Sequence, residues 1–221
     1  MKDIAAIVLA AGLSRRMGVF KPLLPFGDST VIESCINNLR AAGVEEIVVV
    51  TGHRSDDIRA QLEHCPVTFT LNPEPTSEMS MSIALGVRQI HSNTKAVLIT
   101  PVDHPAVPPE IIKAVIEEWR RSQATLIQPA FESRGGHPVL VDLCYRDELL
   151  NLNPQSGLRS LFAEHREQVP RLPVSSPVVA GDMDTWEDYL DLHLALFGRK
   201  PEQTSGGKLL AATNEKPPGL I

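Results

Sequence analysis

Residues 7–26, IVLAAGLSRRMGVFKPLLPF, join an apolar run to a glycine and a basic loop. The apolar run at 7–11 is typical of a strand that is buried on both faces of a parallel sheet. Gly12 ends the run, and small, polar and basic residues follow it up to Lys21. Nucleotides usually bind at the carboxyl end of the first strand of an open α/β sheet, where backbone N–H groups and cations suit an anion. The pattern therefore indicates a polyphosphate site.

The same local pattern also occurs in domains that bind no ligand. The stretch contains neither the G-x-x-x-x-G-K-[ST] phosphate loop nor the G-x-G-x-x-G dinucleotide turn. The stretch is therefore either a phosphate-binding loop or a purely structural one, and residues elsewhere in the chain are needed to distinguish the two.

The whole chain has 221 residues and a formal net charge of -6. This length suits one α/β domain, and this charge gives no overall attraction to nucleic acid or to an anionic membrane. The cysteines Cys35, Cys65 and Cys144 show no metal-ligand spacing, which favours reduced thiols. No apolar run approaches membrane-spanning length, and no charged and apolar leader precedes the first strand. We expect a soluble, cytoplasmic protein with neither nucleic acid nor membrane as a partner.

Alternating strand and helix patterns predict an α/β fold. After the opening strand, we expect further strands at 47–52, 67–71, 96–100, 125–128, 139–141 and 169–174. We expect helices at 31–39, 56–62, 83–87, 109–121 and 189–197, with another beginning at 157. Ser29 or Thr30 can cap the first helix. Residues 1–199 form the predicted domain, and residues 200–221, rich in Pro, Gly, Ser, Thr and Lys, are expected to be a flexible tail.

Polar residues follow two of the predicted strands. Asp103 follows the strand at 96–100, between Pro101 and Pro105, and is well placed to hold Mg²⁺. It could instead cap the helix that begins near Pro109. Asn72 follows the strand at 67–71 and is predicted to lie at the same edge of the sheet.

Other candidates carry two interpretations each. Ser80 and Ser82 precede a helical pattern, so they are expected first to cap it, although their hydroxyls could also bond a nucleotide. Capping and the helix dipole explain some of the acidic residues at 182–188, but Asp182 or Asp184 could also join Asp103 at one cation. His137 has no partner that the sequence supplies, which favours a structural role over a catalytic one.

Four motifs then occur in order: LAAGLSRRMG at 9–18 with Lys21, PVDHP at 101–105, RGGHP at 134–138 and DMDT at 182–185. With them, residues 4–197 resemble the nucleotidyltransferase family that contains molybdenum cofactor cytidylyltransferase and molybdenum cofactor guanylyltransferase. The resemblance implies a three-layer α/β/α Rossmann-like nucleotidyltransferase fold with a mostly parallel central sheet. It also implies Mg²⁺ as cofactor and transfer of CMP from CTP to the phosphate of molybdopterin, with release of pyrophosphate. The alanine at position 11 looks like the cytidylyl and sugar-type members, since guanylyl enzymes usually carry glycine there.

The resemblance further implies roles for individual residues. The catalytic residues it implies are Arg16, Lys21 and Asp103. The metal ligands are Asp103 and Asp184, with Asp182 as the alternative to Asp184. The nucleotide-binding residues are Leu9, Ala10, Ala11, Gly12, Ser14, Arg16, Lys21, Asn72, Ser80 and Ser82. The acceptor-binding residues are Arg134, Gly135, Gly136 and His137, and the family implies a transient contact with a molybdoenzyme or its chaperone.

The chain also departs from the family pattern. Glu78 replaces a usual glycine, Met81 replaces a usual serine, and the residues at 100–102 before Asp103 differ from the common ones. Two rival functions therefore stand beside the first. One is the same chemistry on a sugar phosphate or another small phosphorylated acceptor, and the other is a non-catalytic nucleotide-binding protein.

Overall fold

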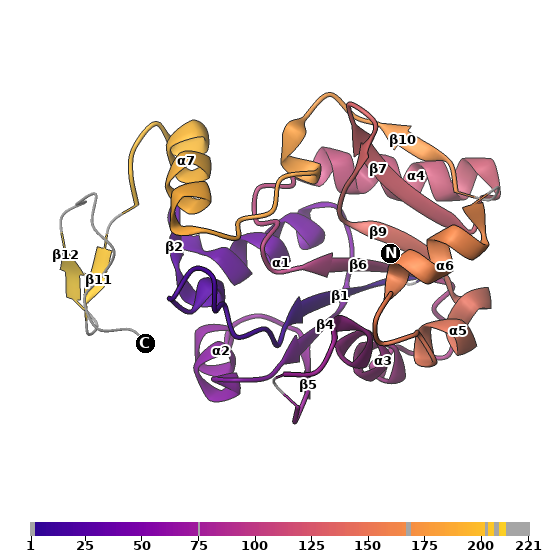
Figure 1. Ribbon diagram of the computed structural model, residues 1–221, viewed down its shortest axis with the longest axis horizontal. Coiled ribbons are helices and arrows are strands. Elements are labelled where there is room, and N and C mark those ends of the chain that lie inside the picture. The colour runs from indigo at the N-terminus through magenta and orange to yellow at the C-terminus, as the bar shows by residue number, and fades with distance from the viewer. Residues whose placement is uncertain (1–2, 75, 167–168, 202, 206–207, 211–221) are drawn as a thin grey trace.

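A computed structural model of the protein describes residues 3–74, 76–166, 169–201, 203–205 and 208–210. Within these residues the central sheet has eight strands in the order β10-β7-β9-β6-β1-β4-β5, with β8 paired to β7 (Figure 1). Its strands are β1 (Ile4–Ala10), β4 (Glu46–Thr51), β5 (Thr68–Leu71), β6 (Ala96–Pro101), β7 (Leu126–Phe131), β8 (Arg134–Gly135), β9 (Val139–Asp142) and β10 (Arg171–Pro173).

The sheet is parallel on one side and mixed on the other. β1 pairs in parallel with both β4 and β6, and β5 extends this half beyond β4. β9 lies antiparallel between β6 and β7, while β10 runs parallel to β7. The prediction of a mostly parallel sheet is confirmed, and the antiparallel strand is the feature that it did not specify.

Helices cover both faces of the sheet. The helices are α1 (Val31–Ala41), α2 (Ser55–Gln61), α3 (Met79–Gln89), α4 (Pro109–Ser122), α5 (Arg146–Leu150), α6 (Leu158–Glu164) and α7 (Trp186–Phe197), and the 3-10 turns are η1 (Lys21–Leu23), η2 (Leu143–Tyr145) and η4 (Pro177–Val179). Every residue of β1 is buried, since alternate side chains enter two separate cores. One core packs α1, α2, α4 and α7, and the other packs α3, α5 and α6. The three-layer α/β/α arrangement is therefore confirmed (Figure 1).

The start of α1 agrees with its sequence. Thr30 Oγ1 accepts a hydrogen bond from Glu33 N, and the Glu33 carboxylate accepts one of 2.8 Å from Thr30 N. This reciprocal pair satisfies two backbone donors that a helix start would leave free. Thr30, one of the two residues expected at this cap, therefore fills it, and the short hairpin of β2 (Pro25–Phe26) and β3 (Ser29–Thr30) leads into it.

Two helix starts differ from the predictions. α3 begins at Met79 after Glu78, which provides no side-chain cap, so Ser80 and Ser82 lie inside the helix and are buried instead of capping it. α7 begins at Trp186 and not at 189, because Thr185 and Asp188 form a capping box ahead of the apolar pattern.

The carboxyl-terminal segment is described only in part. Within it, β11 (Gln203–Ser205) pairs antiparallel with β12 (Lys208–Leu210). Within the segment expected to be flexible, residues 202, 206–207 and 211–221 lie outside the described residues, so that expectation stays a prediction. Among the residues that the structure describes, no helix has both the length and the apolar character needed to cross a membrane.

Candidate active site

A cleft of about 290 Å³ opens at the edge of the sheet where β1, β4, β5 and β6 end. Because these strands run parallel, their carboxyl ends bring segments that are far apart in the sequence to one edge. The lining residues are Leu9, Ala11, Gly12, Ser14, Arg15, Arg16, Lys21, Pro22, Asn72, Ser77, Met79, Ser82, Pro101, Val102, Asp103 and Asp184.

The loop after β1 is held by its own hydrogen bonds. Ser14 has a positive φ of 51°, its carbonyl accepts a 3.0 Å bond from Gly18 N, and its hydroxyl accepts a 3.1 Å bond from Lys21 N. Met17 anchors the middle of the loop in the core with 1% of its surface exposed. Ser14 therefore shapes the loop that presents Arg16 and Lys21.

Gly12 is a glycine that neither packing nor backbone conformation requires. An added Cβ there would meet no atom of the described residues within 4 Å, and the φ of Gly12 does not lie in the left-handed region. At Gly52, by contrast, a Cβ would lie 2.6 Å from the carbonyl oxygen of Ala11, so that glycine permits close backbone packing. Since Gly12 lines the cleft, its missing side chain leaves room for a ligand to approach the backbone.

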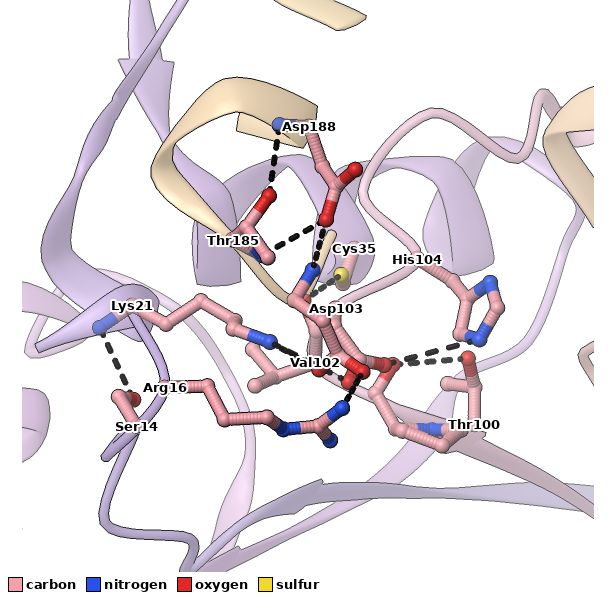
Figure 2. A network of polar contacts seen from close by, with 12 residues as sticks. Ser14, Arg16, Lys21, Cys35, Thr100, Val102, Asp103, His104, Thr185 and Asp188 are labelled. Carbon is pink, nitrogen blue, oxygen red and sulfur yellow. Dashed lines mark hydrogen bonds and ion pairs between the residues drawn. The ribbon is translucent and has the colours of Figure 1, made fainter. Parts of the chain in front are cut away.

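Two cations and two carboxylates meet in the cleft (Figure 2). The Lys21 ammonium lies 3.4 Å from Asp103 Oδ2 and 3.2 Å from Asp184 Oδ1. An Arg16 guanidinium nitrogen lies 2.6 Å from Asp184 Oδ2. The Lys21 side chain is only 8% exposed, whereas that of Arg16 is 74% exposed. The cluster therefore combines a buried cation with a solvent-exposed one.

Backbone contacts place the two carboxylates beside each other. Val102 N donates a 3.1 Å bond to the Leu9 carbonyl, and Met183 N donates a 3.2 Å bond to the Asp103 carbonyl. Asp103 does not cap α4, whose N-cap is Pro108. The segment before α7 is thus fastened directly to the loop after β6.

The charges of the cluster act on Asp184. Burial by itself would raise the pKa of Asp184, but the hydrogen bond and charge of Lys21, the Asp182 contact and the Arg16 charge together lower it. Asp103 Oδ1 is buried, with no hydrogen-bond partner in the described part of the chain, and lies 3.6 Å from His104 Nε2. Asp184 is therefore held in its ionised form, and one oxygen of Asp103 has unused capacity as an acceptor or ligand.

Asp182 and Asp184 differ in position. Asp182 is exposed and does not line the cleft, whereas Asp184 is partly buried and does. In the described residues, Asp103, Asp182 and Asp184 do not bring three ligand atoms within 4.8 Å of one another; a surface group of Glu148, Glu164 and His165 does. The cleft therefore offers two converging carboxylates and not three.

Asn72 holds two serines of the cleft lining in place through hydrogen bonds. Its Nδ2 donates 2.9 Å bonds to the hydroxyls of Ser77 and Ser82, while its Oδ1 accepts a 3.0 Å bond from Glu74 N. Asn72 is 3% exposed, so its side chain is largely used within the protein. Ser77 and Ser82 line the cleft. Ser80 and Ala10 are buried and do not line it; the Ala10 side chain belongs to the core that packs α1, α2, α4 and α7.

His104 is a buried histidine that the sequence did not single out, and it lies beside His137. The rings of His104 and His137 lie 4.9 Å apart, and His137 Nδ1 is 3.4 Å from the carbonyl oxygen of Ile99. Burial, with the charge of His104, lowers the pKa of His137 to about 4, and burial lowers that of His104 against the opposing charge of Asp103. Both rings are therefore neutral at pH 7. His104 follows Asp103 directly in the PVDHP motif, which was the signal available for it.

The predicted acceptor loop lies outside the cleft lining. A Cβ on Gly136 would lie 2.1 Å from the carbonyl oxygen of Val179, and one on Gly135 would overlap the Gln128 side chain. His137 N donates a 2.9 Å bond to that same Val179 carbonyl. Packing against the Val179 backbone therefore accounts for Gly136, whereas Gly135 meets only the end of a flexible side chain. None of the four residues at 134–137 lines the cleft.

The chain has relatives among known proteins. Residues 6–169 match the family described as the MobA-like NTP transferase domain. Molybdenum cofactor cytidylyltransferase of Escherichia coli (strain K12) is 25% identical over 192 residues, which cover 86% of this chain and 95% of the relative. Nicotine blue oxidoreductase of Paenarthrobacter nicotinovorans is 24% identical over 193 residues, covering 83% of this chain and 93% of the relative. A solved nucleotidyl transferase from Methanothermobacter thermautotroptrophicus has a TM-score of 0.75 and 26% identity, and the match covers 86% of this chain and 95% of that chain.

Proposed function

Since the chain belongs to the family of MobA-like NTP transferase domains, we propose that it transfers CMP from CTP to the phosphate of molybdopterin and releases pyrophosphate. Membership gives nucleotidyl transfer as the reaction class. One relative at nearly the same identity is named as an oxidoreductase, so the choice of reaction also has to be argued from the site. The observation that carries the proposal is the group of two cations and two carboxylates that lines the cleft beside Gly12.

These residues match the demands of the reaction. In nucleotidyl transfer an anionic phosphate oxygen attacks the α-phosphorus of the nucleotide, and the bond from that phosphorus to pyrophosphate breaks. Positioning and charge neutralisation supply most of the rate, and an acceptor that is already a phosphate needs no general base. Arg16 and Lys21 are placed to neutralise the triphosphate and the leaving pyrophosphate, and the backbone at Gly12 leaves room for the nucleotide.

A divalent cation fits the donor set. Asp103 and Asp184 offer hard carboxylate oxygens from two segments, and Asp103 Oδ1 is buried without a hydrogen-bond partner among the described residues. Mg²⁺ is usually held by one or two carboxylates together with substrate phosphates, which agrees with two converging aspartates. We infer that Asp103 and Asp184 hold Mg²⁺, which supplies neutralisation of phosphate charge when bound.

The specificity for CTP and molybdopterin depends on the E. coli relative and on the alanine at position 11. The cleft does not add support for the acceptor, because residues 134–137 lie outside its lining. A sugar phosphate or another small phosphorylated acceptor is therefore the alternative to test beside molybdopterin.

Pyrophosphate release in the presence of Mg²⁺ tests the proposal. CTP, GTP, ATP and UTP are compared with and without molybdopterin, and the Asp103→Asn protein purified in parallel gives the background rate. We expect release with CTP that requires molybdopterin and is absent in the variant. Release that requires a sugar phosphate and not molybdopterin would replace the acceptor. Nucleotide binding without release for any acceptor would favour the non-catalytic alternative.

A further inference from the structure

The carboxylates proposed to hold the metal are already paired with cations of the chain itself. Each oxygen of Asp184 has its own partner, since Oδ1 faces the Lys21 ammonium at 3.2 Å and Oδ2 faces the Arg16 guanidinium at 2.6 Å. Asp103 Oδ2 shares Lys21 at 3.4 Å. The charges of Arg16 and Lys21 therefore balance those of the two carboxylates they contact, and Arg15 adds a further positive charge to the cleft lining.

The same two cations are the groups expected to meet the triphosphate. A cation held close to a carboxylate has part of its charge neutralised and its position fixed by that contact, so a phosphate gains less from binding it unless the ion pair loosens. The carboxylates and the polyphosphate therefore compete for Arg16, and less completely for the buried Lys21.

We propose that Arg16, supported by Lys21, acts as a built-in counter-ion that disfavours a divalent cation at Asp103 and Asp184 until a polyphosphate draws the guanidinium away. The inference rests on the proposed function, since it concerns how the same cleft binds its metal and its nucleotide. A cation that approaches the unliganded cleft meets two positive charges and an oxygen of Asp184 that is already hydrogen-bonded. A polyphosphate that binds Arg16 neutralises one of these charges and frees Asp184 Oδ2, so each ligand improves the site for the other.

Thermodynamic linkage makes this coupling reciprocal: the factor by which polyphosphate raises metal affinity is the factor by which metal raises polyphosphate affinity. The competing interpretation is that the Arg16 contact is an ordinary surface ion pair. Its 74% exposure makes that a fair alternative, because exposed pairs often contribute little. The two interpretations differ in what the loss of Arg16 does to a metal ion that is offered alone.

The test measures Mn²⁺ bound to the purified full-length protein by electron paramagnetic resonance, with no nucleotide present. Arg16→Gln is compared with wild type. Arg15→Gln is the matched control, because this adjacent arginine also lines the cleft, whereas Asp184 forms its ion pairs with Arg16 and Lys21. We expect Arg16→Gln to bind Mn²⁺ alone about threefold to tenfold more tightly, given the solvent screening of an exposed pair. Arg15→Gln should change the affinity by less than about twofold.

A second experiment uses calorimetry to measure the binding of inorganic tripolyphosphate in metal-free buffer that contains EDTA. Arg16→Gln should bind tripolyphosphate more weakly than wild type, so that one substitution strengthens one ligand and weakens the other. Unchanged or weaker Mn²⁺ binding in Arg16→Gln would overturn the inference. So would a gain in Mn²⁺ affinity that persists when Asp184→Asn is added, because the gain is assigned to the release of Asp184.

The outcome is separate from that of the proposed function. Opposite shifts for Mn²⁺ and tripolyphosphate in a protein that releases no pyrophosphate would support the counter-ion role and count against the reaction. Pyrophosphate release together with an unchanged Mn²⁺ affinity in Arg16→Gln would support the reaction and overturn the counter-ion role.

Discussion

Replacing Asp103 by asparagine keeps the size of the side chain and removes its charge. Lys21 then loses one of its two carboxylate partners, at 3.4 Å, and keeps Asp184 at 3.2 Å. Loss of a whole partner from a buried pair typically costs 3–5 kcal/mol, and with a second carboxylate retained we expect the free energy of unfolding to fall by about 1–2 kcal/mol. Turnover should fall by more than about a hundredfold, or about 2.7 kcal/mol of transition-state stabilisation.

The assay combines pyrophosphate release at saturating CTP with urea unfolding of the same preparations. Asp184→Asn should lose turnover to a similar degree, because Asp184 also lines the cleft. Asp182→Asn should lose less than about tenfold, since its carboxylate is exposed and acts through Asp184. Comparing the three variants shows whether turnover depends on the carboxylates that line the cleft or on any negative charge near the start of α7.

Turnover near the wild-type rate in a folded Asp103→Asn protein would refute the assignment of Asp103 to the reacting site. A rate that falls equally in all three variants would instead refute the distinction between Asp182 and Asp184. The urea unfolding curves show whether a variant loses turnover because it is unfolded. A loss of about 2 kcal/mol in the free energy of unfolding leaves most domains folded at room temperature.

Four further outcomes are expected. Gly12→Ala should leave the free energy of unfolding within about 0.5 kcal/mol of wild type and raise the KM for CTP, whereas Gly52→Ala should destabilise in urea, since its Cβ would meet the Ala11 carbonyl at 2.6 Å. Thr30→Ala should cost about 1 kcal/mol in urea unfolding through loss of its capping box, and an unchanged midpoint would contradict that cap. The pKa of His137 is about 4 in the folded state against an ordinary 6.5, so the folded state binds fewer protons than the unfolded state between these pH values. The free energy of unfolding should therefore fall by about 3 kcal/mol as the pH drops from 6.5 to below 4. A His137→Gln protein with the same pH dependence of stability would argue against this assignment. EDTA should abolish pyrophosphate release, and added Mg²⁺ or Mn²⁺ should restore it; release that persists in EDTA would exclude the metal.

Local sequence was sufficient where the controlling interactions are local. The sequence around α1 limited its capping residue to two candidates, because a cap bonds backbone groups only a few residues away. The spacing of apolar residues likewise located the buried strands and most helices. The start of α7 was missed by three residues. Thr185 and Asp188 form a capping box inside an acidic run for which the sequence left both capping and metal binding open.

Long-range packing accounts for the remaining errors. Ser82 was expected to cap a helix, but a hydrogen bond from Asn72, ten residues earlier, places it on the wall of the cleft. The sequence permits a substrate-facing interpretation of the glycines at 135 and 136. In the structure, Gly135 packs against the Gln128 side chain and Gly136 against Val179, which belongs to the segment at 177–180. No local pattern contains the position of that segment.

The sequence by itself determined the α/β class, the strand with its basic loop, and an aspartate at the end of the strand that became β6, because hydrophobic period and turn residues act along the chain. Only the tertiary structure decided that Lys21 lies between Asp103 and an aspartate 163 residues away, and that Asp184 and not Asp182 enters the cleft. It also decided that the rings of His104 and His137 lie 4.9 Å apart, tilted by 46°. These contacts depend on the order of strands in the sheet, including the antiparallel β9 between β6 and β7, and this order arises from the packing of the whole core.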